Sequence, residues 1–265
     1  MNPHNLITDE IVHSTIIADK GNNAQVLKWE VSDFLKVGDN LATFVTSIIV
    51  DFTIEGRNET VSYIVKLNPC RESSGWDSIY PEIFEHESVF LQNVGPRINT
   101  FLGGDRTLNI PKCYHSSLVA RRQFIICNDL RVRNFTLFDK KLSLDADHTN
   151  LVIKELAKLH AGSYLMIKKF GIETIMKDYP IVKSEVLRDE PNNGILDIFQ
   201  NLIEACLTIP IAFLPQYPEY DCVLQWIKSK KPNAGKLLSR CVKSCPEHMK
   251  VVGHGDCWVN NLLFR

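Results

Sequence analysis

The sequence GHGDCWVNNLLFR, residues 253–265, contains the most informative pattern of the chain. Asp256 stands two residues after His254, and Asn261 follows Asp256 by five residues. Phosphoryl transfer uses this pair of residue types, because a carboxylate accepts the proton of the attacking hydroxyl while a nearby amide oxygen helps to hold magnesium. The alternative is a buried turn in which Asp256 caps the backbone and Trp258 packs as an apolar anchor. Residues 253–265 are called the candidate catalytic loop below.

The whole pattern, H-G-D-x-W-x-x-N-N with an apolar tail, resembles the catalytic loop of the ecdysteroid kinase-like family. That family belongs with the choline kinases and aminoglycoside phosphotransferases, which are small-molecule kinases. Protein kinases have the same offset from Asp to Asn, with Arg where this chain has Gly255. The resemblance extends over about residues 30–265. It implies that Asp256 accepts or orients the proton of a substrate hydroxyl and that Asn261 binds magnesium.

The composition is that of an ordinary globular chain. At 265 residues and 45% hydrophobic, it has material for one large core or two lobes. A net charge of −1 gives no basic footprint for nucleic acid. The N-terminus lacks the apolar core of a signal peptide, and the most apolar run, residues 41–54, is too short and polar to span a bilayer. The eight cysteines follow no framework and are typical of reduced thiols. We therefore expect a cytoplasmic protein that binds neither nucleic acid nor a membrane.

The first half of the chain alternates strand patterns with turns. Residues 1–24 are expected to form a polar lead-in with a short helix around residues 9–18. Five runs rich in β-branched or apolar residues predict strands at residues 26–31, 45–55, 61–66, 110–115 and 123–127.

Gly38, Asp39 and Asn40 stand between two strand-like runs and predict a hairpin turn. The G-D-N sequence resembles the nucleotide-covering loop of the ecdysteroid kinase-like family. That resemblance implies that its backbone N–H groups and Thr43 lie near the phosphates. From these residues alone, an ordinary hairpin turn is the simpler interpretation.

Lys66 ends an apolar run, where a lysine is poorly placed unless its ammonium meets an anion. The next run, residues 83–91, has helical spacing and carries Glu87 on the same face as Phe84. Kinase sites pair a strand lysine, which holds phosphates, with a helix glutamate. The resemblance therefore implies that Lys66 binds the nucleotide phosphates and that Glu87 holds Lys66. Glu85 lies on another helix face. Taken singly, a surface lysine and a solvated glutamate remain the alternative.

The segment Asn128–Asp129–Leu130 follows the last strand candidate and precedes helix-like patterning. The resemblance makes it the link between two lobes, where backbone groups of Asp129 and Leu130 meet the adenine edge. The ecdysteroid kinase-like family usually has an acidic residue where this chain has Asn128.

The second half is expected to be helical. The predicted helices span residues 149–164, 194–208, 219–229 and 234–244, with proline punctuation at Pro210, Pro215, Pro218 and Pro232. The first contains L-A-K-L-H-A-G-S, which resembles the family's L-A-x-x-H-A-x-S helix. His160 in this motif either supports the candidate catalytic loop or is a satisfied core histidine.

The end of the chain also contains residues that suit two other chemistries. Cys241, Cys245, His248 and His254 do not have the spacing of a structural zinc site. Cys257 beside His254 could act as a thiol nucleophile, but sequence neighbours rarely reach that geometry, and we expect Cys257 to pack.

Together these features predict an α+β, two-lobed protein-kinase-like fold. Residues 25–130 form the N-lobe, a nucleotide-binding sheet with one helix, and residues 131–265 form a helical C-lobe that ends at the candidate catalytic loop. The resemblance implies ATP and Mg²⁺ as cofactors and a small hydroxylated substrate, with ecdysteroids as the named steroid example.

The chain stops four residues after Asn261. Kinases also use an acidic magnesium ligand downstream, the Asp of D-F-G in protein kinases and a comparable D-F-Q in the resembled family. We therefore expect either a fragment or incomplete gene model of a longer kinase, or a shortened form, and impaired catalysis by the chain as written. The alternative function is a non-catalytic nucleotide-binding or interaction protein of the same fold.

Overall fold

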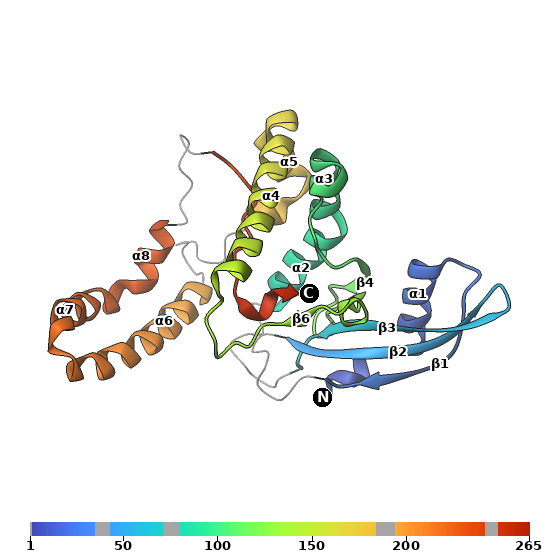
Figure 1. The fold of residues 1–265 in the computed structure, drawn as a ribbon, viewed down its shortest axis with the longest axis horizontal. Coiled ribbons are helices and arrows are strands. Elements are labelled where there is room, and N and C mark those ends of the chain that lie inside the picture. Colours follow the sequence, from blue (N-terminus) through green and yellow to red (C-terminus); the bar gives the residue numbers. More distant parts are fainter. Residues whose placement is uncertain (1, 35–42, 71–79, 184–193, 242–248) are drawn as a thin grey trace. The chain divides into compact units, whose positions relative to one another are not determined.

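The computed structural model describes residues 2–34, 43–70, 80–183, 194–241 and 249–265 (Figure 1). These residues belong to two compact units. The first contains residues 1–182 together with 249–265, and the second contains residues 183–248. The hairpin turn predicted at Gly38, Asp39 and Asn40 lies outside the described residues.

The first unit contains a five-stranded antiparallel sheet in the order β1-β2-β3-β5-β4. The strands are β1 (Gln25–Ser32), β2 (Phe44–Ile54), β3 (Arg57–Leu67), β4 (Cys113–Ser117) and β5 (Phe124–Asn128). All five strand candidates of the sequence are present. β4 begins later than expected, after Pro111, which has no N–H to donate to a sheet.

A tight hairpin joins β2 and β3. Ile54 is the register partner of Arg57, and the two residues between them, Glu55 and Gly56, both have positive φ angles, 50° and 74°. Two positive φ angles define the type I′ turn, which matches the twist of a hairpin. The turn therefore lies one residue earlier than the Gly56–Asn58 segment suggested by the sequence.

Helices contribute to a core on each face of this sheet. Along β5, Phe124 and Ile126 belong to one core, whereas Ile125 and Cys127 belong to another, as the alternation of side chains along a strand requires. The first core includes Val12 and Ile16 of α1 (Asp9–Lys20), so the expected lead-in is in fact part of the core.

The second core includes Phe84 and Leu91 of a long helical stretch. The stretch is formed by α2 (Tyr80–Val89), a π-helical turn (Phe90–Val94) and α3 (Gly95–Leu102). The helix predicted at residues 83–91 is therefore present. It holds Glu87 on the face of the sheet that carries Ile125.

A third core joins α3 to α4 (Ala146–Phe170) and α5 (Ile172–Asp178). Gly162 allows the close approach of α3 and α4, because a Cβ atom there would lie 2.6 Å from Ile98 Cγ2. Residues 183–248 belong to the second unit, and the chain belongs to the first unit again from Met249. It ends in β7 (Leu263–Phe264), which pairs antiparallel with β6 (Thr136–Leu137).

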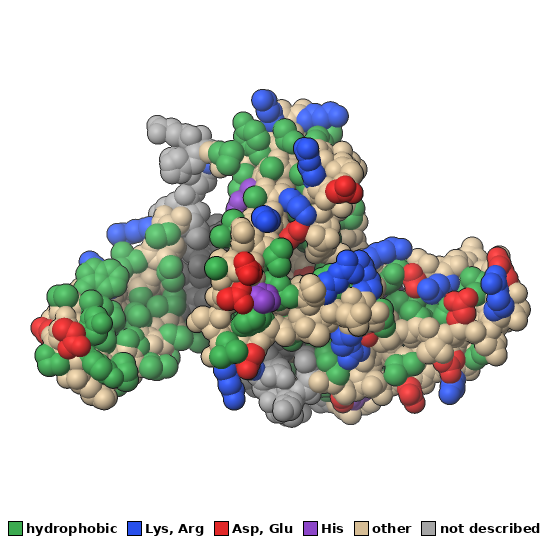
Figure 2. Space-filling view, in the orientation of Figure 1, with side chains coloured by type: hydrophobic (Ala, Val, Ile, Leu, Met, Phe, Trp, Pro, Cys, Tyr) green, Lys and Arg blue, Asp and Glu red, His purple; other side chains and the backbone are tan. Residues whose placement is uncertain are grey.

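The second unit is helical and contains α6 (Gly194–Phe213), α7 (Asp221–Lys230) and α8 (Ala234–Cys241). α6 continues through Pro210, so the expectation that this proline bounds the helix was wrong. Pro210 has no N–H and so removes one i→i−4 bond, and α6 ends three residues after it, at Phe213. Figure 2 shows hydrophobic side chains over α6 and α7, and Ile209 and Trp226 are among the most exposed of them.

The remaining elements are 3₁₀ turns at Pro3–Leu6, Gly104–Arg106, Leu130–Arg133, Pro180–Lys183, Leu214–Gln216, Pro218–Tyr220, Lys231–Asn233 and Val259–Asn261. The described helices include none with the length and apolar character that a membrane span requires. Strands with helices on both faces, followed by a helical region, confirm the α+β class predicted from the sequence.

Candidate functional site

Lys66 and Glu87 form an ion pair between strand β3 and helix α2. Lys66 Nζ lies 2.5 Å from Glu87 Oε1, and each side chain is 31% exposed. Glu85, two residues earlier on α2, is exposed on another face. The pairing of Lys66 with Glu87 rather than Glu85, expected from helical geometry, is therefore present.

The sheet fixes the position of Lys66. Its register partners are Val45 on β2 and Ile125 on β5, so the lysine lies on an inner strand. Thr43 stands immediately before β2 and is half-buried. It is therefore close in register to Lys66, whereas Gly38, Asp39 and Asn40 lie outside the described part of the chain.

The candidate catalytic loop brings Asp256 and Asn261 into contact. Asn261 Nδ2 donates to the Asp256 carboxylate oxygen Oδ2 and to its backbone carbonyl, both at 2.9 Å. The 3₁₀ turn Val259–Asn261 produces this contact by folding the amide back over the aspartate. Asp256 and Asn261 are both exposed, so their remaining polar atoms can be reached by a ligand.

Gly255 determines the conformation of the backbone immediately before Asp256. Its φ of 79° lies in the left-handed region, which favours glycine. The turn places the Asp256 N–H 3.3 Å from His254 Nδ1, which accepts its hydrogen bond. Gly255 therefore allows the H-G-D segment to close on itself.

The loop is attached to the first unit on both sides. Before it, the Val252 N–H donates to Ser163 Oγ at 3.0 Å, and Ser163 is fully buried in α4. At the far end of the loop, Phe264 pairs with Thr136 and packs edge-on against His148, with the ring centroids 4.7 Å apart. These contacts hold the ends of a loop whose middle residues are exposed.

Sequence reasoning named His160 as the residue of α4 that could support the loop. In the structure it is Ser163, the last residue of the same L-A-x-x-H-A-x-S motif, that contacts Val252. Its hydroxyl donates to the His160 carbonyl at 3.1 Å and accepts from Val252, so one buried group satisfies two backbone partners. The motif therefore did indicate which part of α4 contacts the loop. Histidine is the more common functional residue type, so sequence reasoning selected His160 instead of Ser163.

Asp129 is a buried structural carboxylate. It is 3% exposed and accepts hydrogen bonds from Ser62 Oγ at 2.6 Å and from the Arg131 guanidinium at 2.7 Å. Burial alone would raise the pKa of Asp129, but the hydrogen bonds from Arg131 and Ser62 outweigh it and lower the pKa below its usual value. The side chain is thus fully used in fixing the segment between β5 and the helices.

The backbone of this segment is also partly used. The Leu130 carbonyl accepts from the Phe135 N–H at 3.2 Å, and the Asn128 N–H donates to the Lys112 carbonyl at 3.0 Å. Asp129 caps the 3₁₀ turn Leu130–Arg133. A role of Asp129 and Leu130 in binding adenine stays a prediction. For Leu130 the N–H is a better candidate than the carbonyl, because the carbonyl already accepts a hydrogen bond from Phe135.

The structure also bears on the alternative chemistries. Cys257 is exposed, so the expectation that it packs was wrong. Partial desolvation and the charge of Asp256 raise the pKa of Cys257, which makes its thiolate scarcer and disfavours a nucleophilic role. Cys245 and His248, two members of the zinc alternative, lie outside the described residues. Trp258 is 46% exposed and does not form the buried anchor that the capped-turn interpretation required.

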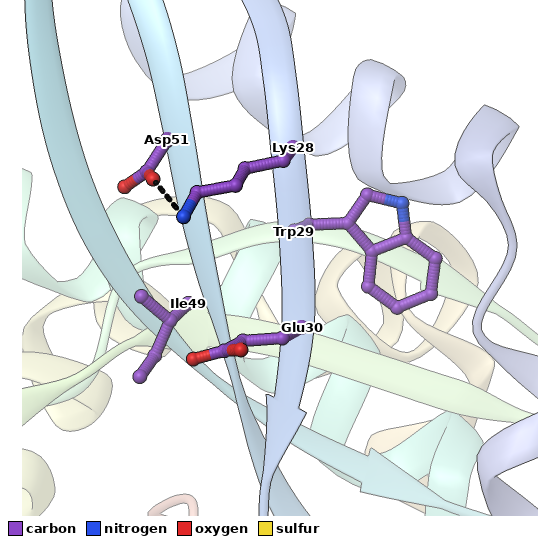
Figure 3. Close-up of a pocket in the computed structure, with 5 residues that line it drawn as sticks. All are labelled: Lys28, Trp29, Glu30, Ile49 and Asp51. Carbon is purple, nitrogen blue, oxygen red and sulfur yellow. Dashed lines mark ion pairs between the residues drawn. The ribbon is translucent and has the colours of Figure 1, made fainter.

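The sequence-predicted residues therefore form two pairs within the first unit, Lys66 with Glu87 and Asp256 with Asn261. No contact between the pairs is found in the described residues, and their convergence on one nucleotide stays a prediction. A hollow on β1 and β2 shares no residue with either pair (Figure 3). Its volume of about 40 Å³ suits a water molecule rather than a nucleotide.

The comparisons with known proteins give one match. No curated protein and no solved structure matches this chain. The family model of the ecdysteroid kinase-like family matches residues 37–265, a range that includes Lys66, Glu87 and the whole candidate catalytic loop. Most of the chain thus falls within the match. The chain belongs to the ecdysteroid kinase-like family.

Proposed function

We propose that this protein is a small-molecule kinase that uses ATP and Mg²⁺ and transfers the γ-phosphoryl group to a hydroxyl of its acceptor. Membership of the ecdysteroid kinase-like family supports phosphotransferase chemistry on small molecules. The observation that carries the proposal is the direct contact between Asp256 and Asn261. Ecdysteroids are the first acceptors to test.

Asn261 suits a magnesium site. Both of its contacts to Asp256 are made by Nδ2, which leaves the amide oxygen, Oδ1, available as a ligand. Mg²⁺ prefers hard oxygen ligands, and the Asp256 carboxylate beside the amide adds negative charge. Bound there with the nucleotide, the ion would supply neutralisation of phosphate charge during transfer.

Lys66 suits a phosphate site. An ammonium group has three N–H donors, and one of them is directed to Glu87. The other two can donate to phosphate oxygens. Glu87 then has a positioning role, because it holds the ammonium at a fixed place on the face of the sheet.

Asp256 is the group that we expect to meet the acceptor. Asn261 holds Oδ2, so the second carboxylate oxygen is available to accept or orient the hydroxyl proton of the substrate. The exposure of the loop leaves room for an acceptor to approach. Catalysis of this kind depends on positioning and charge stabilisation rather than on a covalent intermediate.

The test is ATP turnover with a panel of hydroxylated acceptors that includes ecdysteroids, other steroids and choline-like amines. We expect weak, acceptor-dependent release of ADP by the wild type, in keeping with the impaired catalysis expected from its sequence, and loss of that release in Asp256→Asn, which keeps the size of the side chain. Asp105→Asn is the matched control, because Asp105 is an exposed carboxylate in a 3₁₀ turn far along the chain from the loop.

Two results would count against the proposal. Turnover that survives in Asp256→Asn would remove the aspartate from the mechanism. Nucleotide binding that depends on Lys66, without turnover on any acceptor, would favour a non-catalytic nucleotide-binding protein of the same family.

A further inference from the structure

Cys113 and Cys127 lie directly opposite each other on adjacent strands. Cys113 begins β4, Cys127 lies near the end of β5, and the two are register partners in the antiparallel pair. β4 is the edge strand of the sheet. Cys113 is half-buried there, whereas Cys127 is only 7% exposed. One thiol of the pair is therefore reachable from solvent and the other is enclosed.

The hydrogen bonds around the pair indicate which type of cross-strand position it occupies. The neighbouring residues Lys112 and Asn128 are joined by a backbone bond, because the Asn128 N–H donates to the Lys112 carbonyl at 3.0 Å. Hydrogen-bonded and non-hydrogen-bonded pairs alternate along antiparallel strands, so Cys113 and Cys127 form a non-hydrogen-bonded pair. In such pairs the Cα atoms are about 4.5 Å apart, within the range of about 4.4–6.8 Å found for disulfides.

The two sulfurs also interact as free thiols. The interaction with the Cys127 side chain lowers the pKa of Cys113 below its usual value. The same interaction, with burial, raises the pKa of Cys127. The half-buried sulfur of the pair is thus the one that more readily becomes a thiolate, which is the nucleophile in thiol–disulfide exchange.

We propose that Cys113 and Cys127 are a site of reversible oxidation, where a small disulfide such as glutathione disulfide closes a cross-strand bond between β4 and β5. The Cys113 thiolate attacks one sulfur of the small disulfide, a mixed disulfide forms, and one small thiolate leaves. Cys127 then loses its proton and attacks the Cys113 sulfur, and the second small thiolate leaves. Overall, two protein thiols are oxidised to one disulfide while one small disulfide is reduced to two thiols.

The position of this bond connects it with the candidate nucleotide site. Cys127 and Ile125 lie on the same face of β5, and Ile125 is the register partner of Lys66. That face is packed against Phe84 of α2, the helix that carries Glu87. The charge of Glu87 contributes to the pKa of both cysteines, so the thiol pair and the ion pair lie within electrostatic reach.

Closing the bond brings the two sulfurs to about 2.05 Å, far inside the distance at which two free thiols can pack. The sulfur atoms then lose part of their packing against α2, and tightly packed cores transmit such shifts. We expect Glu87 to move relative to Lys66 and nucleotide affinity to fall by about fivefold, the low end of typical coupling between two sites. This last step rests on the proposed function; the disulfide itself does not.

The experiment treats the full chain with glutathione disulfide, blocks the remaining thiols and maps the tryptic peptides. Cleavage after Lys112, Arg121, Arg122 and Arg131 gives peptides 113–121 and 123–131, each with one cysteine. The expected result is a cross-linked pair of these peptides that dithiothreitol separates. ATP affinity is measured in parallel on reduced and oxidised protein.

Cys70→Ser is the matched control. Cys70 is also half-buried, but its sulfur contacts the backbone carbonyls of Asn68 and Arg121 rather than another thiol. The variant should still form the cross-link and show the same change in affinity on oxidation. Cys113→Ser, which keeps the size and polarity at an edge position, should form no cross-link and bind ATP equally well with and without the oxidant.

The possible outcomes distinguish the disulfide site from its proposed effect on nucleotide binding. Glutathione adducts on Cys113 without the cross-linked peptides would overturn the disulfide site. A mapped cross-link with unchanged ATP affinity would overturn its effect on Lys66 and Glu87. A mapped cross-link in a protein whose reduced form binds no ATP would contradict the proposed function and leave the oxidation site established.

Discussion

The buried hydroxyl of Ser163 accepts a hydrogen bond from the Val252 N–H at 3.0 Å and so ties helix α4 to the start of the candidate catalytic loop. The two residues are 89 positions apart in the sequence. Ser163 thus fixes where the loop leaves the core.

We expect Ser163→Ala to loosen the loop. The half-buried Val252 N–H would lose its partner, and we expect a cost near the low end of the about 1–3 kcal/mol that an unsatisfied buried donor costs. Amide hydrogen exchange should accelerate at residues 252–256. Ser229→Ala is the matched control, because Ser229 makes the same bond to a carbonyl three residues earlier but is exposed in α7. Equal protection of the loop in both variants would contradict a role for Ser163 in holding it.

The Lys66–Glu87 pair should matter more for nucleotide binding than for stability. Partly exposed ion pairs contribute about 0.2–1 kcal/mol, so Lys66→Met and Glu87→Gln should unfold at nearly the wild-type denaturant concentration. Both should weaken ATP binding, and the double variant should lose less than the sum of the two, because Glu87 acts through Lys66.

The pair Lys28 and Asp51 provides the control for that cycle (Figure 3). It also pairs a strand lysine with a carboxylate, at 3.2 Å, but between β1 and β2, and Lys28 is 79% exposed. Lys28→Met should leave ATP affinity unchanged. A loss of affinity equal to that of Lys66→Met would indicate a general effect of charge rather than a phosphate site.

Local patterns in the sequence predicted the strands and the pairing of Lys66 with Glu87. β-branched runs give strands, and a spacing of 100° per residue separates Glu87 from Glu85. The same reasoning took residues 1–24 as a lead-in, because it could not show that Val12 and Ile16 meet the sheet. Such contacts depend on tertiary packing, for which a single sequence gives only weak signals.

In the candidate catalytic loop too, local features could be predicted from the sequence and contacts with distant residues could not. Residue types and spacing singled out Asp256 and Asn261, and the contact between them follows from one 3₁₀ turn. The burial of Asp129 and the role of Ser163 depend on partners 67 and 89 residues away. Neither partner, Ser62 nor Val252, belongs to a motif that sequence reasoning could use.

Asp129 should make the protein sensitive to acid. Its folded-state pKa is below the usual value, so ionised Asp129 stabilises the fold at neutral pH, and this stabilisation is lost as the pH falls through the folded-state pKa. Asp129→Asn should cost on the order of 2 kcal/mol at pH 7. The difference from wild type should shrink below about pH 4.

Urea unfolding of both proteins across this pH range measures the effect of Asp129. Asp105→Asn, at an exposed carboxylate, should follow the wild-type curve throughout. A difference between wild type and Asp129→Asn that stays constant down to the lowest pH would show that the charge of Asp129 is not what stabilises the fold.

Gly255→Ala should disturb the candidate catalytic loop through the backbone alone. A Cβ atom at Gly255 would meet no atom within 4 Å, so there is no steric clash with neighbours. The φ of 79° is the obstacle, because an L-residue in the left-handed region costs about 1 kcal/mol. The turn should partly open, the Asp256 N–H should lose His254 Nδ1, and phosphoryl transfer should slow while ATP binding through Lys66 persists. Gly253→Ala is the matched control, since Gly253 also has open space around it but no positive φ. If the two alanine variants slow transfer equally, the left-handed turn at Gly255 does not position Asp256.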